Sequence, residues 1–204
     1  MRIGIFGGTF DPIHFGHLIK AHEAREALRL DQVWFIPAGD PWMKRNQKVA
    51  LAKHRLAMVE LAIGTEDHFK SSDVEVKRSG PTYTIETIKT IRHNQGSDVE
   101  LFLLIGTDSL RYLGQWKNPE HLLELVTIAT FERPGSVLDE TESLEPHWLD
   151  RIKPGARIAV RKVPGTPIDI KGSDIRRRVA EGKSVRYRTK DAVIDYINEQ
   201  DLYR

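Results

Sequence analysis

The chain has 204 residues, of which 40% are hydrophobic, and this is enough to bury a core of ordinary size. Lysine and arginine number 31 against 29 aspartate and glutamate residues, a formal net charge of +2. Such an even balance argues against a protein that covers a nucleic acid backbone, so basic residues are expected to gather at a site. The absence of cysteine excludes disulfides, thiolate metal sites and a cysteine nucleophile.

No stretch approaches the roughly 18 apolar residues that a membrane-crossing helix requires. The chain also starts without the basic and apolar regions of a signal peptide. We therefore expect a cytoplasmic protein with a single domain over residues 1–204, and with neither membrane nor nucleic acid among its partners. The sequence leaves open whether the protein forms a homo-oligomer.

Predicted strands and helices alternate along the chain. Strands are expected at Ile3–Phe6, Gln32–Ile36, Ser72–Lys77, Val99–Ile105, Thr127–Phe131 and Arg157–Val163. Helices are expected at Gly16–Leu28, Leu51–Ile63, Thr84–His93, Pro119–Leu125, Ser173–Ala180 and Lys190–Ile197. Several strands are continuous apolar runs, which is typical of parallel strands covered on both faces. The pattern predicts an α/β fold: a Rossmann-like, doubly wound, mostly parallel sheet with helices on both faces and a C-terminal helical segment.

Residues 7–17, Gly-Gly-Thr-Phe-Asp-Pro-Ile-His-Phe-Gly-His, carry the strongest functional signal. A glycine turn between a strand and a helix brings backbone N–H groups close to a phosphate. Gly16 has no Cβ, so a ligand can approach the backbone where the helix begins. His14 and His17 add side-chain donors at the positive end of that helix. The segment therefore predicts a triphosphate site.

Three other interpretations of this segment fit poorly. The G-x-G-x-x-G fingerprint of dinucleotide-binding oxidoreductases cannot be placed on Gly4, Gly7, Gly8 and Gly16, and a Walker P-loop is absent. A zinc pair formed by the two histidines has no cysteine and no evident third ligand nearby.

The string GGTFDPxHxGH resembles the nucleotidyltransferase superfamily that is built around the H-x-G-H motif. Its longer form is similar to the bacterial nicotinate-nucleotide adenylyltransferases. The resemblance implies transfer of the adenylyl group of ATP to nicotinate mononucleotide, which yields nicotinate adenine dinucleotide (deamido-NAD) and pyrophosphate in NAD biosynthesis. It implies Mg²⁺ as the cofactor, held mainly through the ATP phosphates, with no metal ligand from the protein.

Four later segments extend the resemblance over nearly the whole chain. They resemble the family patterns I-P-A-x-x-P-x-K, R-x-G-x-[ST]-Y-T, I-G-x-D-S-L and I-S-S-T-x-I-R, and lie at 36–44, 78–84, 105–110 and 170–176. In the last of these, Lys171 and Gly172 replace the usual pair of small hydroxyl residues, so two expected hydrogen-bond donors are missing.

The resemblance assigns site residues by their positions in these motifs. The implied catalytic residues are His14, His17, Lys44 and Arg176. The implied ATP-binding residues are Gly7, Gly8, Thr9, Phe10, Gly16, Gly106, Asp108 and Ser173. The implied mononucleotide-binding residues are Tyr83, Thr84 and Trp116. Taken alone, Thr84 and Asp108 also fit helix capping, Tyr83 and Trp116 fit core packing, and Lys44 fits a solvated surface lysine.

Two further functions remain open on the sequence. The chain could act on nicotinamide mononucleotide, or on both mononucleotides, within the same superfamily. It could also be a nucleotide sensor on the same fold that binds without turnover. The pantetheine-phosphate enzymes fit less well, because they lack the Gly7-Gly8 start and the Tyr83-Thr84 segment.

Overall fold

A computed structural model describes residues 1–41, 48–131 and 160–204. Its centre is a six-stranded sheet in the order β3-β2-β1-β4-β5-β6, and every neighbouring pair is parallel. The strands are β1 (Arg2–Gly8), β2 (Gln32–Pro37), β3 (Phe69–Ser71), β4 (Glu100–Gly106), β5 (Thr127–Phe131) and β6 (Val160–Val163). The order reverses between β1 and β4, which confirms the doubly wound fold and places a crevice at the carboxyl ends of these two strands.

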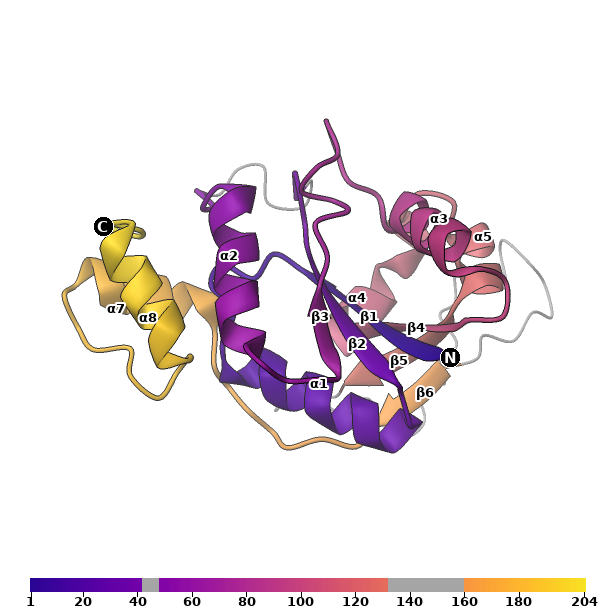
Figure 1. Cartoon of the computed structure of the whole chain (residues 1–204), viewed down its shortest axis with the longest axis horizontal. Helices are drawn as coiled ribbons and strands as arrows, with labels where there is room; N and C mark the ends of the chain where they lie inside the picture. Colours follow the sequence, from indigo (N-terminus) through magenta and orange to yellow (C-terminus); the bar gives the residue numbers. More distant parts are fainter. Residues whose placement is uncertain (42–47, 132–159) are drawn as a thin grey trace.

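Helices cover both faces of the sheet (Figure 1). They are α1 (Phe15–Leu28), α2 (Ala52–Ile63), α3 (Thr84–Gln95), α4 (Thr107–Arg111), α5 (Pro119–Leu125), α7 (Gly172–Ala180) and α8 (Asp191–Glu199). A 3₁₀ turn, η2 (Leu113–Gln115), joins α4 to α5. The last helix, α8, drawn in yellow in Figure 1, packs against α2, so the C-terminal segment contacts the first half of the chain.

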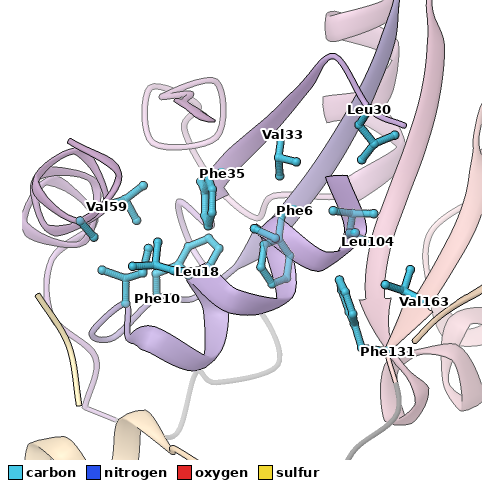
Figure 2. Packing of buried hydrophobic residues seen from close by; sticks show 14 of the residues in the cluster. Phe6, Phe10, Leu18, Leu30, Val33, Phe35, Val59, Leu104, Phe131 and Val163 are labelled. Atoms are coloured by element: carbon cyan, nitrogen blue, oxygen red, sulfur yellow. The ribbon is translucent and has the colours of Figure 1, made fainter. Parts of the chain in front are cut away.

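The core divides into two clusters because alternate residues of a strand point to opposite faces of the sheet. Phe102 and Leu104 of β4 join the cluster beneath α1 and α2, where Phe6 and Phe35 also pack (Figure 2). Leu101, Leu103 and Ile105 of the same strand join the other cluster, beneath α3 and α5. This packing explains why the strand reads as an unbroken apolar run.

One predicted strand is wrong. Residues 72–77 do not extend the sheet: β3 ends at Ser71, and the chain then turns, with the N–H of Lys77 bonded to the carbonyl of Asp73 at 2.9 Å. The alternating valines mimic a half-buried strand, but Glu75 between them turns inward and accepts a hydrogen bond from Thr87 at 2.7 Å. Of the predicted strand Arg157–Val163, residues 157–159 lie outside the described ranges.

Candidate active site

A cavity of about 1540 Å³ opens at the carboxyl ends of β1 and β4, where the strand order reverses. The predicted site residues that line it are Gly7, Gly8, Thr9, Phe10, His14, Gly16, His17, Tyr83, Thr84, Gly106, Trp116, Ser173 and Arg176. Asp108 lies in the first turn of α4 and is not among the lining residues. Lys44 lies outside the described residues.

His14 and His17 are held in one unit at the start of α1. The backbone N–H of His14 donates to Nδ1 of His17 at 3.2 Å, and the two rings stack with centroids 3.7 Å apart. Because Nδ1 of His17 accepts this bond, the neutral ring carries its proton on Nε2. His17 is therefore fixed in the tautomer that offers an Nε2–H donor.

His14 is more deeply placed than its partner. His14 is 7% exposed. Its burial, together with the nearby charge of Lys20, lowers the pKa of its imidazole to about 4. His14 is consequently neutral at physiological pH and offers hydrogen bonding but no full positive charge. Its Nδ1 is buried and has no hydrogen-bond partner among the described residues.

Two glycines leave space for the rings of His14 and Phe10. A Cβ on Gly16 would stand 3.1 Å from Nδ1 of His14, and a Cβ on Gly8 would stand 3.0 Å from the ring of Phe10. Phe10 is 2% exposed, and its ring meets the ring of His17 edge-on, with centroids 5.0 Å apart. The side chain of Phe10 is thus a packing partner of His17, and only the backbone of Phe10 is available to a ligand.

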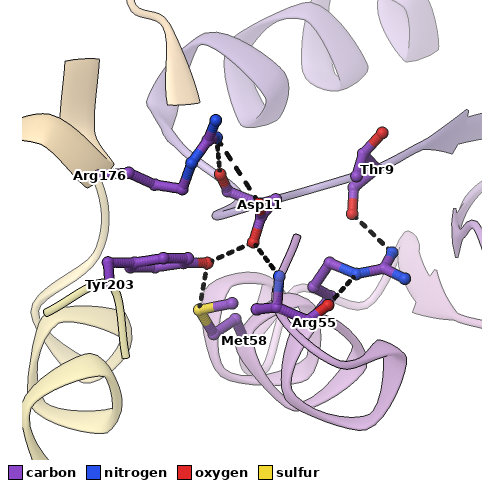
Figure 3. A network of polar contacts seen from close by, with 7 residues as sticks. Thr9, Asp11, Arg55, Met58, Arg176 and Tyr203 are labelled. Atoms are coloured by element: carbon purple, nitrogen blue, oxygen red, sulfur yellow. Dashed lines mark hydrogen bonds and ion pairs between the residues drawn. The ribbon is translucent and has the colours of Figure 1, made fainter. Parts of the chain in front are cut away.

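Arg176 reaches the cavity from α7 and is anchored on Asp11 (Figure 3). Its Nη1 donates to the backbone carbonyl of Asp11 at 2.7 Å and lies 3.6 Å from Oδ2 of the same residue. Gly172 permits this approach, because a Cβ there would stand 2.9 Å from that carbonyl oxygen. Gly172 therefore lets the start of α7 lie against the turn after β1.

Arg55 of α2 ties the two loops at the edge of the cavity together. Its guanidinium donates to the backbone carbonyls of Ala50, Thr9 and Gly39, at 2.9, 2.9 and 3.0 Å. The side chain is 1% exposed, and burial lowers its pKa, an effect opposed by the charge of Asp11. Arg55 thus fixes the turn after β1 to the loop after β2, which is the loop that continues to Lys44.

The other half of the cavity is formed at the start of α3. Tyr83 precedes the helix and Thr84 is its first residue, so unpaired backbone N–H groups face this end. Glu75 lies beneath the helix, and its burial raises the pKa of its carboxyl, an effect opposed by a hydrogen bond from Thr87. The Nζ of Lys117 stands 4.6 Å above the ring of Tyr83.

The residues that follow β4 form the remaining wall of the cavity on the α3 side. Gly106 is the residue that precedes α4, with extended backbone angles of φ −75° and ψ 157°. Trp116 packs against the second core cluster and also lines the cavity. Its indole Nε1 is buried and has no hydrogen-bond partner in the part of the chain that the structure describes.

Sequence reasoning missed three residues of this site. Lys20 lines the cavity one turn beyond His17, a spacing of three residues that places both on one face of α1. Asp11 and Arg55 make contacts that hold the turn after β1 in place. The helical spacing of Lys20 could have found it, whereas an arginine in a predicted helix gives no sign that it binds backbone carbonyls.

The comparisons with known proteins agree with this geometry. A family model described as Cytidylyltransferase-like matches residues 5–178. A protein of Thermomicrobium roseum named "Probable nicotinate-nucleotide adenylyltransferase" is 45% identical over 203 residues, which cover 100% of this chain and 92% of that protein. A Roseiflexus protein of the same name is 42% identical, with 99% and 98% covered. The chain belongs to the nicotinate-nucleotide adenylyltransferases.

The fold of this adenylyltransferase is also found among solved structures. A Plasmodium falciparum nicotinic acid mononucleotide adenylyltransferase complexed with NaAD superimposes with a TM-score of 0.75. The match covers 99% of this chain and 97% of that one at 19% identity, so the likeness concerns the fold alone. Within the described ranges, no helix is both long and apolar enough to span a bilayer.

Proposed function

We propose that this adenylyltransferase joins ATP to nicotinate mononucleotide and releases nicotinate adenine dinucleotide and pyrophosphate, a step of NAD biosynthesis. The supporting observation is the identity of 45% over the full chain to a protein of that name, combined with a cavity that gathers the motif residues. We further propose that residues 1–204 form one domain, since Val193 and Ile197 of α8 share a core cluster with β1 and β2. We place the reaction in the cytoplasm, where the sequence predicts the chain to be.

In our proposal, ATP lies over the turn after β1, with its phosphates at the start of α1. There the Nε2–H of His17 and the guanidinium of Arg176 would face charge that develops at the α-phosphorus and on the departing pyrophosphate. Gly7, Gly8, Thr9, Gly106 and Ser173 line the same cavity and supply backbone or hydroxyl groups. The helix dipole of α1 adds a positive potential at this point.

The acceptor in the proposed reaction needs no activation. Its phosphate monoester is already an anionic nucleophile at neutral pH, so a general base is not required. The described site accordingly works by aligning the two phosphates in line and by stabilising charge. His14, which is neutral, fits the role of a hydrogen-bonding support and not that of a proton acceptor in the reaction.

We propose that nicotinate mononucleotide occupies the half of the cavity at α3. The N–H groups at the start of α3, beside Tyr83 and Thr84, suit the carboxylate of nicotinate. Trp116 offers an indole face to the pyridinium ring, an interaction worth roughly 0.5–2 kcal/mol. The Nζ of Lys117 lies above Tyr83 and pairs with Glu86 at 3.3 Å, so recognition of the carboxylate falls to the backbone N–H groups.

Nucleotidyltransferases of this kind use a divalent metal, and we propose Mg²⁺. Among the described residues no group of three or more His, Asp or Glu side chains could hold an ion. The oxygens of ATP are the hard ligands that Mg²⁺ prefers, so the ion fits this chain as one that arrives with the nucleotide. When bound, it would neutralise charge on the pyrophosphate.

The direct test is product formation from purified chain, ATP, nicotinate mononucleotide and Mg²⁺. We expect equal amounts of nicotinate adenine dinucleotide and pyrophosphate, measured by chromatography and by a coupled phosphate assay. ATP binding without either product would favour the nucleotide sensor and would contradict the proposal.

A further inference from the structure

The penultimate residue of the chain, Tyr203, reaches back to the phosphate-binding turn. Its hydroxyl donates to Oδ1 of Asp11 at 2.7 Å and lies 4.0 Å from the sulfur of Met58 (Figure 3). The backbone of Tyr203 is in the left-handed region, with φ 69°. Its ring also packs against the core cluster that contains Phe6 and Phe35, so packing and the bond to Asp11 together hold the hydroxyl in place.

The bond fixes how the carboxylate of Asp11 is turned. Oδ1 accepts from Tyr203 and from the backbone N–H of Ala50, at 2.7 and 3.3 Å. Oδ2 is thereby directed at Arg176, whose Nη1 lies 3.6 Å away. Asp11 is 5% exposed, so water does not compete strongly for its oxygens.

The orientation of Arg176 follows from that of Asp11. Both contacts of Arg176 with Asp11 use Nη1, and no described residue accepts a hydrogen bond from its Nη2 or Nε. The guanidinium is thus held through Nη1. Because Arg176 lines the cavity, Nη2 and Nε remain as donors for a ligand there. Without the bond from Tyr203, only the longer bond from Ala50 would hold Oδ1, and the carboxylate could rotate and draw more of the guanidinium toward itself.

We propose that Tyr203 is a positioning residue for ATP binding, because its hydroxyl orients Asp11 and Asp11 in turn holds Arg176 at the cavity. This inference rests on the proposed placement of ATP at Arg176, and its kinetic readout rests also on the proposed reaction. Burial, together with the charge of Asp11, raises the pKa of Tyr203, so the hydroxyl remains a donor throughout the pH range of an assay.

The test compares Tyr203→Phe with Tyr196→Phe. Tyr196 lies in α8 and its hydroxyl bonds Nδ1 of His54 at 2.9 Å, a contact of the same kind that leads to α2 and not to Asp11. We expect both variants to fold, with small and similar losses in melting temperature. Only Tyr203→Phe should weaken ATP binding in calorimetry, by about three- to tenfold, and reduce kcat/KM for ATP by a similar factor.

A second comparison separates positioning from general weakening of the fold. In an Arg176→Ala background, Tyr203→Phe should change the Kd for ATP by less than about twofold, because the group through which it acts is gone. Equal effects of the two tyrosine substitutions on ATP binding would overturn the proposal, as would an undiminished effect without Arg176. Tight ATP binding by a wild-type chain that makes no product would contradict the proposed function but leave this comparison valid.

Discussion

The backbone N–H of His14 donates to Nδ1 of His17 at 3.2 Å, while the two imidazole rings stack at 3.7 Å. The bond closes the first turn of α1 and selects the tautomer of His17 in one arrangement. The H-x-G-H spacing thus does more than place two histidines side by side. Because the backbone N–H of His14 occupies Nδ1 of His17, it leaves the ring proton of His17 on Nε2.

His17→Ala should fold normally and lose about 10²–10³ in kcat, the scale expected when one preorganised donor is removed. The donor lost is Nε2–H, which the contact with His14 directs away from the backbone. Circular dichroism and steady-state kinetics check the two halves of this prediction. Full activity in the variant would remove His17 from the mechanism.

The stability of the fold should depend on pH through His14. Burial lowers its pKa from 6.5 to about 4, so between these values the unfolded chain binds a proton that the folded chain does not. Stability from this group is therefore complete above about pH 6.5 and falls as the pH drops toward 4, by on the order of 3 kcal/mol.

Urea unfolding of wild type and His14→Gln at about pH 7 and about pH 4.5 measures this effect. The variant should lose less stability than wild type between the two conditions. The same loss in both proteins would show that another group is responsible.

Arg55→Lys should damage both stability and activity. A lysine cannot reach the three carbonyls that Arg55 binds, so we expect a loss of about 2–4 kcal/mol in the free energy of unfolding. The KM for ATP should rise as well, because Thr9 and Gly39 are released at the edge of the cavity.

Arg92 provides a matched control for that substitution. It also binds three backbone carbonyls, those of Ser97, Val99 and Leu125, but at the far end of α3. Arg92→Lys should reduce the melting temperature and leave the KM for ATP within about twofold. Similar rises in KM for both variants would contradict a local role for Arg55.

Lys20→Met should weaken ATP binding by about tenfold, because it removes a positive charge from the wall of the cavity. The side chain stands close enough to His14 to lower the pKa of that histidine. Lys89→Met, on the exposed face of α3, is the control for loss of one lysine. If calorimetry gives the two variants the same Kd for ATP, Lys20 does not contact the nucleotide.

The sequence predicts the sheet well where periodicity and burial agree, as in the apolar run of β4. It fails at 72–77, where alternating valines suit a strand but the pairing of β3 with β2 ends at Ser71. A hydrophobic pattern indicates which side chains are buried, but not the backbone conformation. A strand and a turn can both bury alternate residues, so the pattern alone does not separate them. The turn is distinguished from a strand by the bond between Lys77 and Asp73 and by the tertiary contact of Glu75 with Thr87, neither of which the pattern reveals.

The motif histidines and Arg176 could be placed in one cavity from their family positions alone. The contacts that hold them could not, because they join residues far apart in the chain. Asp11 meets Arg176 and Tyr203 across more than 160 residues, and nothing local at any of the three indicates it. The close approach of Gly172 to Asp11 is likewise visible only in the folded chain.

The central claim is that this site adenylates the acid mononucleotide. Measuring kcat/KM for nicotinate mononucleotide and nicotinamide mononucleotide side by side, with ATP saturating, tests it most directly. We predict a clear preference for the acid, because the backbone N–H groups at the start of α3 suit a carboxylate, while the charge of Lys117 is balanced by Glu86 at 3.3 Å. Equal values for the two substrates, or a preference for the amide, would contradict the account.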